Sequence, residues 1–237
     1  MSGATRQAAI GLTLAAAIIC AWLALHVWGV FFHDWTAIDW MRVPIFIAVQ
    51  SWLGTGLFIV AHDAIHGSLA PGQPRLNAAV GQLCVGLYAA FSLRKLAANH
   101  KKHHRSPGTR EDPDFDIAQP RAFAPWFRAF FSRYFGWAEF ARLAAVLTVY
   151  LVPLGADPLD MAIFWGLPAV LSAFQLFTFG TYLPHRHEDT AFADEHRARR
   201  LDYSWLLSLI ACFHFGLHHE HHLRPHVPWW RLPTVRV

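Results

Sequence analysis

The stretch IGLTLAAAIICAWLALHVWGVFF, residues 10–32, determines the fold class. It contains no residue that is charged at neutral pH, and it is long enough to cross the roughly 30 Å hydrocarbon core of a bilayer as a helix. It runs longer than the apolar part of a signal peptide and lacks a small-x-small cleavage site. We therefore expect it to be a membrane span and the chain to be an integral membrane protein.

Further apolar segments follow at residues 43–61, 141–156 and 159–183. The second of these is short and has Arg142 near its start, so it must borrow interfacial residues or cross a thin region. Residues 76–93 are also apolar, but Gly81 and Gly86 disfavour a helix interior, and we expect a re-entrant or interfacial hairpin there. Aromatic and basic residues alternate over 126–137, which is typical of a helix on the membrane surface.

The sequence thus predicts an all-α integral membrane fold. It has about four transmembrane helices, interfacial or re-entrant helices and a cytoplasmic histidine-rich cap, all in a single domain covering residues 1–237. The composition agrees, because hydrophobic residues make up 54% and charged residues 15%, whereas soluble domains carry about 25% charge. Three separated cysteines, Cys20, Cys84 and Cys212, argue against disulfides and a cysteine metal site.

The distribution of Lys and Arg predicts the orientation. Most lie within residues 94–142 and 186–236, and only Arg42 falls in a connection that we expect outside. Basic residues favour the cytoplasmic side. Both termini, the central loop and the C-terminal region are therefore expected in the cytoplasm, with the protein crossing the cell inner membrane several times. The modest net charge of +4 suits this role, and no nucleic-acid partner is expected.

Ten of the 16 histidines lie in three short segments, AHDAIHGS (61–68), NHKKHHRSPG (99–108) and GLHHEHHLRPH (216–226), and eight of these share the spacing of one helix face. Spacings of three and four residues place the rings of each segment on one helix face. The eight residues are His62, His66, His100, His103, His104, His218, His221 and His222. Eight or nine imidazoles are too many for one ion and suit two redox-active ions with open positions.

A ninth ligand is expected from either of two positions. His185 follows the last span in TYLPHRHED (181–189), and His214 lies one turn before His218. The spans contain no ExxH pair, which argues against a soluble-type carboxylate-bridged centre. An HExxH motif is also missing, so a zinc protease is not expected. Lone histidines such as His26 are expected to be surface, cap or interface residues.

Acidic residues flank the histidine segments. A metal-bound imidazole usually donates its other N–H to a carboxylate or carbonyl, and Asp63 and Asp114 are the first candidates for this role, ahead of Asp112. The alternative is charge balance against the nearby Lys and Arg. The turn-rich segment SPGTREDPDFD (106–116) is expected to fold back over the metals.

The boxes HDAIH, HKKHH and HHEHH on a four-span frame resemble the membrane fatty-acid desaturase and hydroxylase superfamily. More specific segments are similar to the bacterial β-carotene ketolases (carotenoid 4-oxygenases). These segments are HDAIHGSLAPG, HHRSPGTREDPDFD, FGTYLPHR and ACFHFGLHHEHHLRPHVPWWRLP, and the resemblance runs from about Val60 to Pro233. The stretch ADEHRARRLDYSW (193–205) departs from the Asn-rich stretch expected before the last helix.

The resemblance implies a reaction and its cofactors. Such enzymes use two Fe ions, O2 and electrons from a soluble donor such as ferredoxin. They hydroxylate the C4 methylene of a β-ionone ring twice, and loss of water leaves a ketone. β-Carotene then becomes echinenone and canthaxanthin, and hydroxylated carotenoids lead toward astaxanthin. The eight box histidines would be iron ligands, and His185 occupies the place of the isolated ninth ligand.

Two alternatives remain from the sequence. A carotenoid hydroxylase or lipid desaturase of the same superfamily would share the metals but form another product. A non-enzymatic metal transporter would need ionisable residues inside its spans, and the spans here contain almost none.

Overall fold

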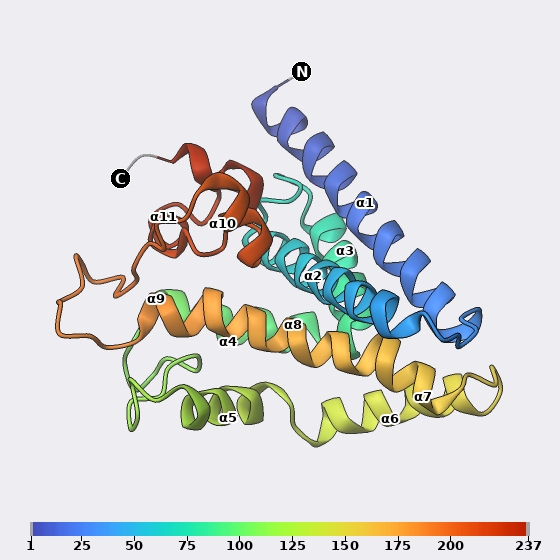
Figure 1. Cartoon of the computed structure of the whole chain (residues 1–237). Coiled ribbons are helices and arrows are strands. Elements are labelled where there is room, and N and C mark those ends of the chain that lie inside the picture. The colour runs from blue at the N-terminus through green and yellow to red at the C-terminus, as the bar shows by residue number, and fades with distance from the viewer. Residues whose placement is uncertain (1, 236–237) are drawn as a thin grey trace.

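Helices make up the regular structure of residues 2–235, the part of the chain that the computed structural model describes, and no strand occurs there (Figure 1). The elements are α1 (Gly3–Phe31), α2 (Asp39–His66), α3 (Pro74–Ala89), α4 (Leu93–Arg105), α5 (Phe123–Tyr134), α6 (Trp137–Leu151), α7 (Pro158–Met161), η1 (Ala162–Gly166), α8 (Leu167–Phe177), η2 (Thr178–Tyr182), α9 (Leu183–His185), α10 (Trp205–Cys212), α11 (His218–Leu223) and η3 (Trp229–Thr234). The predicted all-α fold is confirmed.

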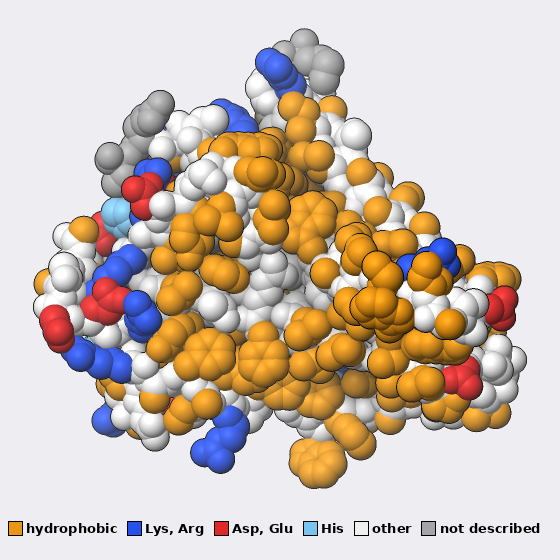
Figure 2. Space-filling view, viewed as in Figure 1, with side chains coloured by type: hydrophobic (Ala, Val, Ile, Leu, Met, Phe, Trp, Pro, Cys, Tyr) orange, Lys and Arg blue, Asp and Glu red, His pale blue; other side chains and the backbone are white. Residues whose placement is uncertain are grey.

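Three helical runs are long and apolar enough to cross a membrane: α1, α2 and the continuous run Pro158–His185 that joins α7 to α9. They correspond to the spans predicted at residues 10–32, 43–61 and 159–183. Their outward faces are apolar, and Figure 2 shows a broad hydrophobic surface over the front of the bundle. Charged side chains gather toward the left edge of that view, where α9 and the following chain lie.

The segment predicted as a short span at residues 141–156 is shorter still. Helix α6 has 15 residues and ends at Leu151, which gives it a length of about 22 Å at 1.5 Å per residue. That length does not reach across the roughly 30 Å hydrocarbon core. Instead, α5 and α6 together return the chain to the end of the bundle where α7 begins (Figure 1).

The hairpin predicted within residues 76–93 does not form there, because Gly81 and Gly86 lie inside one helix, α3. The chain bends by 102° only after it, between α3 and α4. Ion pairs from two partly exposed basic side chains to the buried carboxylate of Glu139 hold the bend against α6. Lys95 Nζ lies 2.9 Å from Glu139 Oε2, and Arg142 lies 2.7 Å from the other oxygen of that carboxylate. Arg142 also donates to the carbonyl of Ala90, at the bend itself. The bend is therefore held by ion pairs and a hydrogen bond to α6.

Two hydrogen bonds define the ends of the bundle. Gln7 near the start of α1 donates to the carbonyl of Ser68 just after α2. At the opposite end, the Trp35 indole donates to Asp160 in α7. Helix α2 lies between α1, α3 and α8 (Figure 1), so its C-terminus is held at the same end as the start of α1. We call this the histidine end.

Close helix packing in the bundle is expected to make one glycine of α2 irreplaceable. A Cβ at Gly56 would lie 2.7 Å from the Phe213 ring, whereas a Cβ at Gly54 would meet nothing closer than 3.5 Å. Overpacking typically costs about 1–3 kcal/mol, and Ala is favoured over Gly in a helix by up to about 1 kcal/mol. Gly56→Ala should therefore lower the thermal unfolding temperature in detergent, and Gly54→Ala should leave it equal or higher. Equal behaviour of the two variants would contradict this packing.

Candidate metal centre

The first two histidines of the centre are positioned by the end of α2. His62 and His66 occupy its last two turns, and Gly67, with φ of 71°, ends the helix immediately after them. This left-handed conformation is accessible to glycine at little cost. Both rings therefore leave a rigid, buried helix at its histidine end rather than a mobile loop.

Helices α4 and α11 bring the other two segments to the same place. His100, His103 and His104 lie on α4, and α11 begins at His218. Before α11 the chain reverses sharply, because Phe213 and His214 both have positive φ, 48° and 62°. The three predicted segments thus converge at one end of the bundle.

The nine predicted histidines form two groups whose ligand atoms lie within 4.8 Å of one another. The first histidine group is His62, His66, His100, His104 and His221, and the second is His103, His185, His218 and His222. The groups are neighbours, because the rings of His104 and His222 stack with centroids 4.3 Å apart.

In both groups, nitrogen atoms of different rings face one another at short range. His100 Nε2 lies 2.9 Å from His62 Nε2 and 2.8 Å from His66 Nε2. In the second group, His222 Nε2 lies 3.1 Å from His103 Nε2 and 3.2 Å from His218 Nε2. Two nitrogens bound to one ion at about 2.1 Å and at right angles would lie about 3.0 Å apart. The donor set and its spacing therefore fit a metal ion in each group.

The protonation state also fits. Burial holds the pKa of His218, His221 and His222 well below the ordinary value for histidine. These imidazoles are therefore neutral at physiological pH, and the neutral ring is the form that binds metal.

His185 and His214, the two candidates for the ninth position, are separated by the structure. His185 Nδ1 donates to the Arg197 carbonyl at 2.7 Å. Its buried Nε2 has no hydrogen-bond partner within residues 2–235 and faces the second group. His214 instead packs beside Trp205 and Trp229 and belongs to neither group.

Asp112 is the carboxylate that supports the centre most directly. Both of its oxygens lie 3.0 Å from His103 Nδ1, and it also accepts from the backbone N–H of Gly108. Burial raises the pKa of Asp112, but His103 and the backbone donors lower it by more, so it lies below its ordinary value. As predicted, the segment 106–116 folds back over the histidines. An ionised Asp112 fixes the His103 tautomer with Nε2 free for a metal.

The carboxylates that the sequence placed first, Asp63 and Asp114, make different contacts. Asp63 accepts from the backbone N–H of Trp229 at 3.2 Å and stands 3.8 Å from His62 Nδ1, beyond hydrogen-bond range. Asp114 accepts from the Tyr134 hydroxyl and lies 3.9 Å from His103 Nδ1. Burial raises the pKa of Asp114 to about 6. Neither carboxylate hydrogen-bonds a histidine ring within residues 2–235, although Asp114 lies in one group with His103 and Asp112.

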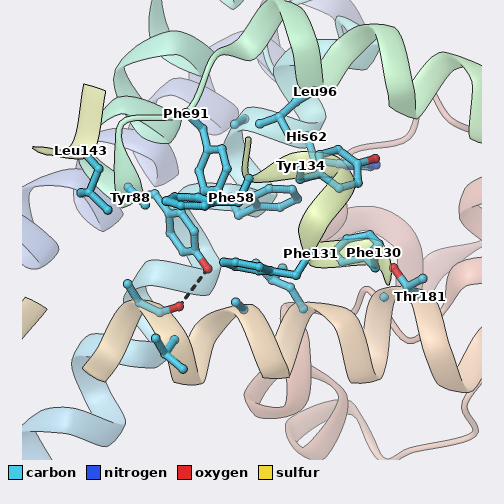
Figure 3. A pocket seen from close by; sticks show the side chains of 18 of the residues that line it. Phe58, His62, Tyr88, Phe91, Leu96, Phe130, Phe131, Tyr134, Leu143 and Thr181 are labelled. Atoms are coloured by element: carbon cyan, nitrogen blue, oxygen red, sulfur yellow. Dashed lines mark hydrogen bonds between the residues drawn. The ribbon is translucent and has the colours of Figure 1, made fainter. Parts of the chain in front are cut away.

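A cavity of about 470 Å³ opens onto the histidines (Figure 3). One wall is the third long helix, from Pro158 to Thr181, which is about 35 Å long at 1.5 Å per residue. Aromatic and aliphatic side chains of α2, α3, α5 and α6 line the remainder, and His62, His100, His103 and His218 close one end. The fold and site together define a membrane-embedded metalloprotein with an apolar chamber beside its metal centre.

Comparisons with known proteins identify the family. The profile of the fatty acid desaturase family matches residues 38–143 and 136–237, and the chain belongs to this family. Two relatives named Beta-carotene ketolase come from Paracoccus. That of strain N81106 is 50% identical over 97% of this chain and 93% of its own length. That of strain PC1 is 49% identical over 99% and 95%.

A more distant relative from Chlamydomonas reinhardtii is named Zeaxanthin 4-ketolase. It is 38% identical over 95% of this chain and 53% of its own length. The resemblance seen in the sequence is confirmed, and the chain is an enzyme of the oxidoreductase class.

Asp112→Asn is expected to weaken the second group. The amide keeps the shape but loses the charge that orients His103, and loss of such a partner typically costs 10–100-fold in metal affinity. Metal content after dialysis against a graded chelator series measures the effect. Glu111→Gln, which changes an exposed carboxylate next in the chain, is the matched control. Full metal retention by Asp112→Asn would remove its assigned role.

Proposed function

We propose that this protein is a β-carotene ketolase that uses O2 to convert the C4 methylene of a β-ionone ring to a ketone. One observation carries the proposal: the apolar cavity runs along a membrane-spanning helix and ends on histidines of both groups. A long hydrocarbon polyene dissolves in the bilayer, and such a chamber leads its ring to a metal centre away from water. The names of the Paracoccus relatives support the same activity.

Two iron ions are the cofactors that we propose, one in each histidine group, and when bound they supply the activation of O2. The nine grouped histidines are their proposed ligands. Each hydroxylation uses one O2, two electrons and two protons, and releases one water. The second gives a geminal diol at C4, which loses water to leave the ketone.

The chain's own residues position the substrate ring. Phe58, Phe91 and Phe130 line the cavity, and Phe215 packs against His62 and His218 with ring centroids 4.6 and 4.9 Å away. Rings of this kind hold a flat polyene by contact and leave no room for water. C4 of the ionone ring is then presented at the closed, histidine-lined end of the chamber.

Electrons come from a soluble reduced carrier such as ferredoxin, in our proposal. Lys101, Lys102 and Arg105 are exposed on α4 at the histidine end, and such a basic face attracts an acidic partner. The same excess of basic residues at the histidine end supports a location in the cell inner membrane with the histidine groups toward the cytoplasm.

Pigment chromatography tests the activity. Cells that make β-carotene and express this chain should accumulate echinenone and canthaxanthin. Cells expressing His221→Ala should retain β-carotene, because the variant lacks a proposed ligand of the first group. The variant protein should still be present in the membrane fraction. Hydroxylated carotenoid without any ketone would instead indicate a hydroxylase.

Metal analysis tests the cofactor. The purified enzyme should hold close to two iron ions per chain. His218→Ala and His221→Ala, one from each group, should each lower that content. His219→Ala is the matched control, because His219 pairs with Asp194 at 2.8 Å and lies outside both groups. An active enzyme that contains zinc alone would overturn the proposed chemistry.

A further inference from the structure

Three polar side chains other than histidine line the metal end of the cavity: Asp114, Tyr134 and Thr181. Figure 3 shows Thr181 and Tyr134 at the same end of the chamber as His62. The Tyr134 hydroxyl already donates to Asp114. Farther along the cavity, Tyr88 donates to the Ala169 carbonyl at 3.1 Å. The Tyr134 and Tyr88 hydroxyls thus already have hydrogen-bond partners within the protein.

Thr181 is different, because its hydroxyl is not used. The residue is only 8% exposed and lines the cavity. Figure 3 draws no hydrogen bond between this hydroxyl and the other cavity-lining side chains, and its oxygen is not among the unpaired side-chain atoms that are fully enclosed by residues 2–235. A buried hydroxyl facing a pure hydrocarbon would lose its hydrogen bonds to water without replacement. It therefore marks a place where a ligand presents an oxygen.

The location of Thr181 indicates which oxygen of a ligand its hydroxyl would meet. Its neighbour Gly180 packs so closely that a Cβ there would lie 2.7 Å from the Phe215 ring, and that ring touches both histidine groups. His185 of the second group follows one turn later on the same helical run. Thr181 is thus beside the position where C4 must meet the metal centre.

We propose that the Thr181 hydroxyl binds the C4 alcohol left by the first hydroxylation and retains it for the second. The proposal rests on the ketolase function proposed above. β-Carotene has no oxygen for Thr181, but the alcohol has one on the reacting carbon. Retention makes the second oxidation, which again uses O2 and two electrons from the donor, faster than release. The protein then releases ketone rather than alcohol.

Ligand binding without turnover gives the direct test. Purified enzyme under anaerobic conditions is titrated with β-carotene or 4-hydroxy-β-carotene, and the polyene absorption change is followed. Thr181→Val keeps the shape but removes the hydroxyl. It should weaken binding of the alcohol roughly fivefold, as expected for one neutral hydrogen bond, and leave β-carotene binding unchanged. Thr181→Ser should restore alcohol binding.

Product analysis gives the second test. Cells expressing Thr181→Val should consume β-carotene at the wild-type rate but accumulate 4-hydroxy carotenoids at the expense of ketones. Thr178→Val, one turn earlier on the helix and outside the cavity lining, is the matched control and should keep the wild-type ratio.

The possible failures are distinct. Equal loss of both ligands in Thr181→Val would show a packing role and overturn the proposal. An unchanged alcohol-to-ketone ratio in cells expressing Thr181→Val would also overturn the proposal. So would an effect of this variant that is confined to carotenoids hydroxylated at C3. Absence of ketone with the wild-type protein would instead contradict the proposed function.

Discussion

Close packing of nine imidazoles at one end of the bundle, six of them buried, is the constraint on which the rest of the structure depends. The nitrogens of the six buried rings are shielded from water, so each needs a partner within the protein or a bound ion. His103 and His185 have their Nδ1 atoms held by Asp112 and by the Arg197 carbonyl. The Nε2 atoms of different rings face one another at short range, and an ion bound between them would give these nitrogens a partner. Metal binding and folding of the histidine end are therefore linked, because the same ligands that bind an ion are otherwise poorly satisfied.

The long elements were predictable from the sequence because hydropathy acts over many residues. Three apolar runs became the three long helical runs, whereas Gly81 and Gly86 lie inside α3 and the bend follows that helix. Spacings of three and four residues likewise placed the histidines of each segment on one face. The segment 141–156 was predicted to span the membrane, but α6 ends at Leu151. The apolar residues that follow form a turn, which hydropathy does not detect.

Features that depend on turns and long-range contacts were not predictable. His103 and His104 are adjacent in sequence but belong to different groups, a division that follows from how α11 and α9 approach α4. Asp112 and Asp114 are two residues apart in a segment without periodicity, so their directions could not be inferred. His26 was expected at a surface or interface, yet it is buried and pairs with Tyr150 at 3.0 Å.

The wall of the chamber contains two π-helical turns, η1 and η2, within one otherwise α-helical run. A π turn accommodates one more residue than an α turn and is frequent at functional sites. Each residue of an α-helix turns the chain by about 100°, so removing one residue from η2 would swing His185 to another side of the helix. The number of residues between the membrane-embedded wall and that ring is thus constrained. A substitution at an outward-facing position such as Leu171, which is 41% exposed, leaves this register unchanged, whereas an insertion or deletion shifts it.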